Sequence, residues 1–172
     1  MVQFSDQRLL LHEVKNHAEF KQKLTKLKLT SDFGLLDAAV IDVTVSWFKL
    51  ARQHAEELAR LDPAQSPRAV YSRAYYAAYS ASKAVRYLSH GIVSLLGDDH
   101  RKVSELPDSF PNVDTWAKDL QVMYEHRLRA DYDNWSKTAS ELTLKPVECA
   151  DMAQRFLAIC EQFLDNAYKV KV

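Results

Sequence analysis

The chain has 172 residues, of which 47% are hydrophobic, and this suits a domain with an apolar core. Only three glycines and five prolines leave little material for tight turns between strands, so the composition favours helices over sheets. The formal net charge is zero and gives no reason to expect binding to nucleic acid or to a membrane. No apolar run approaches the length that spans a bilayer, and no membrane association is expected.

Charge is nevertheless unevenly distributed along the chain. Between Pro67 and Val103, six lysines and arginines stand against two acidic residues, a segment charge of +4. Between Asp131 and Asp165, three stand against seven, a segment charge of −4. A basic stretch of this size is weak support for a phosphate-binding face, and a solvated helix surface is the favoured interpretation.

The two cysteines, Cys149 and Cys160, are expected on the last helix. Their spacing corresponds to about 16 Å along a helix axis, which is too far for a disulfide within the helix. Charged residues also begin close to the N-terminus, where a signal peptide would have its hydrophobic core. The sequence therefore predicts reduced thiols in a cytoplasmic protein.

The first expected helix is amphipathic and covers Gln7–Lys28, with lysines around a narrow apolar stripe. Its apolar face is expected to cap the bundle or to pack on a partner subunit, with contact to RNA or to a membrane surface as the alternative. Turn-forming residues then follow at Thr30–Gly34. The sequence thus predicts an N-terminal helix and linker over residues 1–34, followed by a helical bundle over residues 35–172.

Four further long helices are expected. The second covers about Leu35–Leu61, where apolar residues recur at helical spacing until Asp62-Pro63 ends the pattern. The third begins at Ser66-Pro67, an N-cap residue followed by proline at the first helical position. It continues to His90-Gly91, where the glycine provides a C-terminal stop.

A short helix is expected over about Asp98–Glu105, in the connection that follows. The fourth long helix runs from near Asn112 to about Arg129, and the last begins near Pro146 after a polar loop. The sequence shows no internal repeat. The predicted fold class is all-α: an up-and-down four-helix bundle with an additional N-terminal helix.

One arginine interrupts an apolar stripe on the fourth long helix. The stripe consists of residues spaced by four, three, four and three positions: Trp116, Leu120, Met123, Arg127 and Ala130. Burying a guanidinium alone is costly, so Arg127 needs an acidic partner, solvent, or a groove that takes an anion. Physics alone favours an ion pair with Asp131 or Asp133, or a side chain that extends to solvent.

Three short motifs resemble the HEPN superfamily. The run Ser72–Tyr79 (Ser-Arg-Ala-Tyr-Tyr-Ala-Ala-Tyr) is similar to the tyrosine–alanine signature of its second bundle helix. His100 falls where relatives often carry a histidine that opens the short connecting helix. Arg127–Asp133 is similar to the R-x-x-A-D-Y-D element of a branch often encoded beside nucleotidyltransferases. The resemblance covers about Leu35–Leu164 and leaves out the N-terminal helix.

This resemblance implies a homodimeric helical bundle that needs no cofactor and acts in a toxin–antitoxin or defence system. RNA and a nucleotidyltransferase-type antitoxin are the partners that it implies. Many HEPN proteins are metal-independent endoribonucleases with an R-x(4–6)-H motif in a cleft shared by two subunits. There the arginine stabilises the charge on the phosphorane, and the histidine exchanges protons with the 2′-hydroxyl or the leaving oxygen.

The chain departs from that motif at one position. Arg127 matches the arginine, but Tyr132 stands where the histidine would be, with Asp131 beside it. A phenol, whose ordinary pKa is near 10, is a poor general base at neutral pH, although it can donate a proton or position a phosphate. In some relatives, tyrosines beside this motif are adenylylated by the partner nucleotidyltransferase, which gives Tyr132 a second implied role. The implied catalytic residues are Arg127, Tyr132 and Asp131.

Five more residues are candidates for RNA contacts: Arg73, Tyr76, Tyr79, His100 and His126. His126 points about 100° away from Arg127 on the helix, so it is expected to contribute only across a two-fold interface. His100 can reach the site from the connecting segment, and capping of the short helix is its favoured structural role. The tyrosines, Tyr75 included, can stack bases, but a core position is the favoured interpretation. For Arg73, added positive charge and pairing with an acid are equal alternatives.

The sequence does not predict three other common kinds of functional site. The sequence has no Gly-rich phosphate loop, no Cys/His spacing suited to zinc and no Glu-x-x-His pair for a di-iron centre. Two alternatives to a ribonuclease stay open. The first is a catalytically degenerate HEPN bundle for protein interaction or nucleotide sensing, which the missing histidine and the neutral charge favour. The second is a structural bundle that docks through its N-terminal helix.

Overall fold

The computed structural model describes residues 16–28, 33–92, 97–133 and 143–172. In these residues every regular element is helical, apart from an isolated bridge between Asn16 and Ile92. The elements in chain order are α2 (His17–Lys26), α3 (Phe33–Leu58), α4 (Pro67–His90), the 3-10 helix η1 (Gly97–Lys102), α5 (Val113–Tyr132) and α6 (Pro146–Tyr168). The predicted all-α class is therefore confirmed for the described part of the chain.

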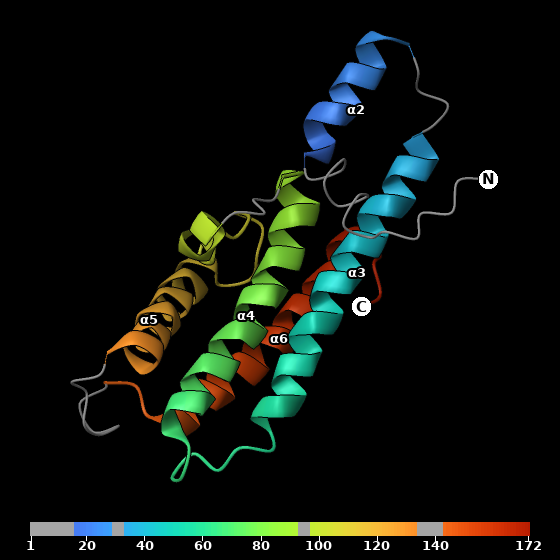
Figure 1. Cartoon of the computed structure of the whole chain (residues 1–172). Coiled ribbons are helices and arrows are strands. Elements are labelled where there is room, and N and C mark those ends of the chain that lie inside the picture. The colour runs from blue at the N-terminus through green and yellow to red at the C-terminus, as the bar shows by residue number, and fades with distance from the viewer. Residues whose placement is uncertain (1–15, 29–32, 93–96, 134–142) are drawn as a thin grey trace.

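Helix α4 is the centre of the arrangement and packs against α3, α5 and α6. Figure 1 shows these four long helices lying alongside one another, with α3 and α5 running in one direction and α4 and α6 in the other. Helix α2 extends beyond the end of this group at which α4 finishes. The described helices thus alternate in direction from α3 to α6.

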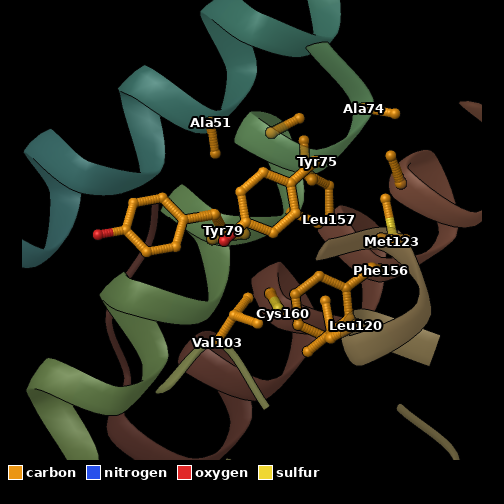
Figure 2. Packing of buried hydrophobic residues seen from close by; sticks show 14 of the residues in the cluster. Ala51, Ala74, Tyr75, Tyr79, Val103, Leu120, Met123, Phe156, Leu157 and Cys160 are labelled. Atoms are coloured by element: carbon orange, nitrogen blue, oxygen red, sulfur yellow. The ribbon is translucent and has the colours of Figure 1, made fainter. Parts of the chain in front are cut away.

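Small residues on α4 explain its central position. Five of its alanines are fully buried: Ala74, Ala77, Ala78, Ala81 and Ala84. Because the distance between packed helices depends on the side chains at the contact, these alanines let the neighbouring helices approach closely. Figure 2 shows where residues of the four long helices meet: Ala51 of α3, Tyr75 of α4, Leu120 of α5 and Phe156 of α6.

The ends of the long helices follow local sequence signals. Helix α4 begins at Pro67 and is followed by Gly91, whose φ of 72° is left-handed, as the sequence predicts. Helix α3 ends at Leu58, three residues before the expected Leu61, with the chain continuing as a turn. Helix α5 extends to Tyr132 rather than to Arg129, so the whole Arg127–Tyr132 segment is helical.

Two expected helices differ from the structure. Helix α2 begins at His17, because Asn16 is non-helical and its side chain accepts a hydrogen bond from the Glu19 amide at 3.1 Å. A continuous helix over residues 7–28 is therefore wrong, while residues 7–15 lie outside the described residues. The connecting element η1 ends at Lys102 instead of Glu105, since the next carbonyl, that of Val103, accepts a hydrogen bond from Ser82 of α4.

The structure also bears on membrane spanning and on the state of the two cysteines. No helix in the described residues combines the length and the apolar character that crossing a bilayer requires. Cys149 and Cys160 are both buried in α6 and form no disulfide. Burial raises the pKa of the Cys149 thiol to about 12, so this thiol is protonated and unreactive at neutral pH.

Gly91 gives a direct test of how α2 meets the bundle. A Cβ atom at this position would overlap Ala18 of α2, and a side chain disfavours the positive φ. We expect Gly91→Ala to lower the free energy of unfolding in urea by about 1–3 kcal/mol. Gly34→Ala is the control, because a Cβ there meets nothing within 4 Å. Equal losses in the two variants would contradict the packing described for Gly91.

Candidate functional site

Arg127 lies in the buried stripe of α5 that the sequence predicts. All five residues of the stripe are buried, and Arg127 itself is 7% exposed. Its guanidinium carbon lies 5.1 Å from the centre of the Tyr76 ring and 5.9 Å from that of Tyr75, both on α4. The ring of Tyr132, on α5 itself, is also 5.1 Å away. A permanent positive charge is therefore held among three aromatic rings.

The three guanidinium nitrogens of Arg127 have different surroundings. Nη2 donates to the hydroxyl of Tyr76 and lies 3.4 Å from the hydroxyl of Tyr132. Nε lies 2.8 Å from Oδ2 of Asp131, which is an ion-pair distance, but its N–H is not aligned for a hydrogen bond. Nη1 has no hydrogen-bond partner among the described residues. Of the two acids expected beside Arg127, Asp131 thus makes the ion pair, and no described residue occupies the two N–H groups of Nη1.

The neighbours keep Arg127 charged. Burial alone lowers the pKa of its guanidinium, but the nearby Tyr76 and the Asp131 carboxylate outweigh burial and raise that pKa. The site therefore presents a cation at every pH of biological interest.

The end of α5 that carries Arg127 is fixed by Arg68 of α4, a residue that the sequence did not point to. Arg68 donates hydrogen bonds to the carbonyls of Ala130 at 3.1 Å and Asp133 at 2.7 Å. The last carbonyls of a helix have no partner within the helix, and a cation there complements the helix dipole. This contact holds the Arg127–Tyr132 segment against α4.

His100, on η1, is brought to the same tyrosines. Its ring stacks on Tyr79 with centroids 4.3 Å apart and an interplanar angle of 24°. Its Nδ1 lies 3.0 Å from the hydroxyl of Tyr75, and its ring centroid lies 5.9 Å from that of Tyr76. Because Tyr75 and Tyr76 also flank Arg127, the predicted candidates Arg127 and His100 both contact the same two tyrosine rings. Burial, and after it the charge of Arg127, lower the pKa of His100, so its imidazole is neutral at pH 7.

Asp99 anchors His100 by tying η1 to α4. Its fully buried carboxylate accepts hydrogen bonds from Arg86 at 3.0 and 3.2 Å and from the Tyr79 hydroxyl at 2.8 Å. Nζ of Lys83 lies 3.2 Å from the same carboxylate. Burial alone would raise the pKa of Asp99, but Arg86 and Lys83 hold it below its ordinary value. This charged network fixes the backbone next to the imidazole.

Arg73 lies where α3 packs beside Tyr76. Its Nη1 is 3.1 Å from a carboxylate oxygen of Glu57 and 3.2 Å from Nδ1 of His54, both on α3. The His54 ring centroid lies 5.6 Å from that of Tyr76. Arg73 therefore pairs with an acid, one of its two expected roles, while its side chain stays 42% exposed. A contact of Arg73 with RNA stays a prediction.

The imidazole of His126 makes its contacts on a different side of α5 from the guanidinium of Arg127. His126 is buried, with Nδ1 placed 2.8 Å from the Val122 carbonyl. Its Nε2 accepts a hydrogen bond from the Leu144 amide at 3.1 Å, and its ring packs against Tyr71. Within one chain, the imidazole therefore holds the residues that precede α6, and both of its nitrogens are engaged.

The buried Asp99 network was missed from the sequence, although part of it carried a signal. Tyr79, Lys83 and Arg86 follow one another at spacings of four and three on α4, the same pattern that singles out Arg127 on α5. Two positive charges that share one helix face need an acidic partner if that face is buried. Which acid it would be, Asp99 or another, depends on how η1 folds back, and no spacing within one helix gives that.

A separate cavity of about 390 Å³ lies where α2 meets the end of α4. Lys21 and Asp37, which line it, pair with each other at 2.8 Å. None of the residues around Arg127 lines this cavity. Within the described ranges, no three His, Cys, Asp or Glu side chains gather in a way that could hold a metal ion.

The residues around Arg127 together offer a fixed cation, a neutral imidazole and, at Tyr132, a phenol that is 71% exposed. Such a set can bind an anion, stack a base and move a proton. No protein-family model, curated protein or solved structure matches this chain.

The Asp99 network predicts a specific dependence of stability on pH. Asp99→Asn leaves Arg86 and Lys83 buried without their carboxylate, and we expect a loss of about 3–5 kcal/mol in the free energy of unfolding at neutral pH. A carboxylate whose pKa is lowered by folding stabilises the fold above its unfolded pKa, about 3.9, and loses this effect as the pH falls through the folded value. The difference between wild type and variant should therefore shrink below about pH 4.

Urea unfolding monitored by circular dichroism between neutral and acidic pH measures this difference. Asp37→Asn serves as the control, since Asp37 pairs with Lys21 at the surface, where such a pair is worth less than about 1 kcal/mol. If Asp99→Asn unfolds like Asp37→Asn at neutral pH, the buried network does not hold η1 in place.

Proposed function

We propose that this chain is a HEPN-like up-and-down four-helix bundle that binds RNA through Arg127 and cleaves it without a metal ion. In this proposal it acts as a homodimer within a toxin–antitoxin or defence module. The support is the resemblance of Ser72–Tyr79 and Arg127–Asp133 to that superfamily, together with the geometry around Arg127.

The environment of Arg127 is the observation that carries the proposal. An arginine that serves stability alone needs one acidic partner, and Asp131 provides it. That role leaves unexplained why three aromatic rings surround the guanidinium and why Nη1 has no hydrogen-bond partner in the described part of the chain. A planar guanidinium with a donor that no described residue occupies matches a phosphate oxygen, and the exposed ring of Tyr132 beside it matches a base of a single strand.

In the proposed reaction the 2′-oxygen of a ribose attacks the adjacent phosphorus, and the bond from phosphorus to the 5′-oxygen breaks. The products are a 2′,3′-cyclic phosphate and a 5′-hydroxyl. Arg127 stabilises the negative charge that builds up on the phosphoryl oxygens, because its position and charge are fixed before the reaction. Tyr132 and Asp131 lie beside it, Tyr132 to position the phosphate and Asp131 to orient the guanidinium.

Tyr132 also fits the second role that the resemblance implies. Its side chain is 71% exposed at the last residue of α5, although it reaches back to Arg127. A nucleotidyltransferase partner therefore has access to the phenol. Adenylylation would place a bulky anion beside Arg127 and block the phosphate site, so the same residue would link the site to its antitoxin.

A catalytically degenerate bundle is the competing function. Asp131 already neutralises Arg127, and Tyr132 replaces the motif histidine. In that case the site would bind RNA or a nucleotide and leave it intact.

Binding and cleavage of a short single-stranded RNA in EDTA test the proposal. Arg127→Ala should weaken binding, measured by fluorescence anisotropy, by about tenfold to a hundredfold, the equivalent of a charge-assisted hydrogen bond. It should also abolish cleavage. Arg127→Lys keeps the charge but loses the planar fork, and it should recover part of the binding.

Arg129→Ala is the matched control, because it removes the same charge from the solvent side of the same helix. Thermal melts of each variant show that the fold survives. Equal affinity and cleavage in wild type and Arg127→Ala would refute the site. RNA binding without cleavage by the wild type would favour the degenerate bundle.

A further inference from the structure

The reaction proposed above needs a base for the 2′-hydroxyl proton, and two histidines other than His126 lie beside Tyr76, which contacts Arg127. The ring centroids of His54 and His100 lie 5.6 and 5.9 Å from that of Tyr76. A base must have a nitrogen lone pair that no other group occupies and that is unprotonated at working pH. The hydrogen bonds of the two rings decide between them.

His54 does not meet this requirement. Its Nδ1 faces Nη1 of Arg73 at 3.2 Å, and arginine can only donate, so this nitrogen is the acceptor. A neutral imidazole has one protonated nitrogen, which leaves the proton of His54 on Nε2. His54 thus presents a donor, and its lone pair is already in use.

His100 has the opposite arrangement. The Tyr75 hydroxyl oxygen lies 3.0 Å from Nδ1 and 3.4 Å from the backbone carbonyl of the same residue, His100. Both contacts are satisfied when Nδ1–H donates to the hydroxyl and the hydroxyl donates to the carbonyl. The lone pair of His100 then lies on Nε2, which has no hydrogen bond to a described residue.

The surroundings keep His100 neutral and fixed. Its ring stacks on Tyr79, whose hydroxyl donates to Asp99, the residue before His100. The pKa of His100 is lowered from its ordinary value because burial and the charges of Arg127, Lys83 and Arg86 outweigh the opposite effect of Asp99. The titratable and charged side chains that face the His100 imidazole come from α4, η1 and α5: Tyr75, Tyr76, Tyr79, Lys83, Arg86, Asp99 and Arg127.

We propose that His100, through Nε2, is the general base of this site and replaces the histidine that Tyr132 displaces from the motif. The proposal rests on the proposed function, since it needs RNA bound at Arg127. Nε2 takes the proton of the 2′-hydroxyl while the 2′-oxygen forms its bond to phosphorus. The bond to the 5′-oxygen breaks with its electron pair, and that oxygen takes a proton from the imidazolium or from water. The residue that moves the proton therefore comes from η1 rather than from α5.

The test compares wild type with His100→Gln on a single-stranded RNA in EDTA, across a range of pH. We expect the cleavage rate to fall by about a hundredfold to ten-thousandfold, the usual contribution of a positioned base. Affinity for a 2′-deoxy analogue, which cannot react, should change by less than about threefold, since Arg127 supplies the phosphate contact. The wild-type rate should rise with pH to a plateau, with a midpoint below the ordinary pKa of a histidine, and this rise should be absent from the variant.

His90→Gln is the control, because it makes the same change at an exposed histidine at the far end of α4. A nitrogen NMR spectrum of the imidazoles in the free protein gives a readout without activity, and it should show the proton of His100 on Nδ1. A proton on Nε2 would overturn the proposal.

The outcomes separate this proposal from the one on which it rests. Cleavage by His100→Gln at the wild-type rate and pH dependence would overturn the role of His100 and leave the function at Arg127 intact. Binding of the analogue by a wild type that does not cleave would overturn both catalytic claims and keep the RNA site. Neither binding nor cleavage by the folded wild type would overturn both proposals.

Discussion

The positive charge of Arg127, held inside an apolar stripe, is the constraint on which the rest of the site depends. Desolvating a guanidinium costs several kcal/mol, and the ion pair with Asp131 repays this cost only in part. An apolar side chain of similar volume at such a position is often as stable or more stable. Stability alone therefore gives no reason for Arg127, whereas an anion that binds at Nη1, which has no hydrogen-bond partner among the described residues, does.

Helix α4 connects Arg127 with two functional groups that are distant in the sequence, the imidazole of His100 and the carboxylate of Asp99. On one side of this helix, Tyr75 and Tyr76 lie against both Arg127 of α5 and His100 of η1, and Tyr79 stacks on His100. The next turns of α4 carry the charges that hold Asp99. The buried alanines on its other faces let α3 and α6 pack closely, and this close packing keeps the tyrosines in fixed positions. The same helix thus builds both the core and the site.

Most of the helices could be predicted because their signals are local. Proline at the start of α4 and Gly91 at its end mark both boundaries, and spacing alone identified the stripe that contains Arg127. What the sequence could not give are contacts between elements. The pairing of Asp99 with Arg86 depends on how η1 folds back on α4. The role of His126, whose imidazole does not join the Arg127 site, depends on its contact with Leu144. The tautomer of His100 likewise depends on Tyr75, which is 25 residues away in the chain.

Side-chain nitrogen NMR of Arg127 and His100, during titration with a 2′-deoxy RNA analogue, tests the central claim most directly. The claim is that a phosphate binds at the charge held between α4 and α5, with the imidazole of His100 beside it. It predicts that both signals shift together with the same midpoint, while the signal of the exposed Arg129 stays in place. An analogue that binds and leaves the signals of Arg127 and His100 unchanged would contradict the claim, and so would the absence of binding.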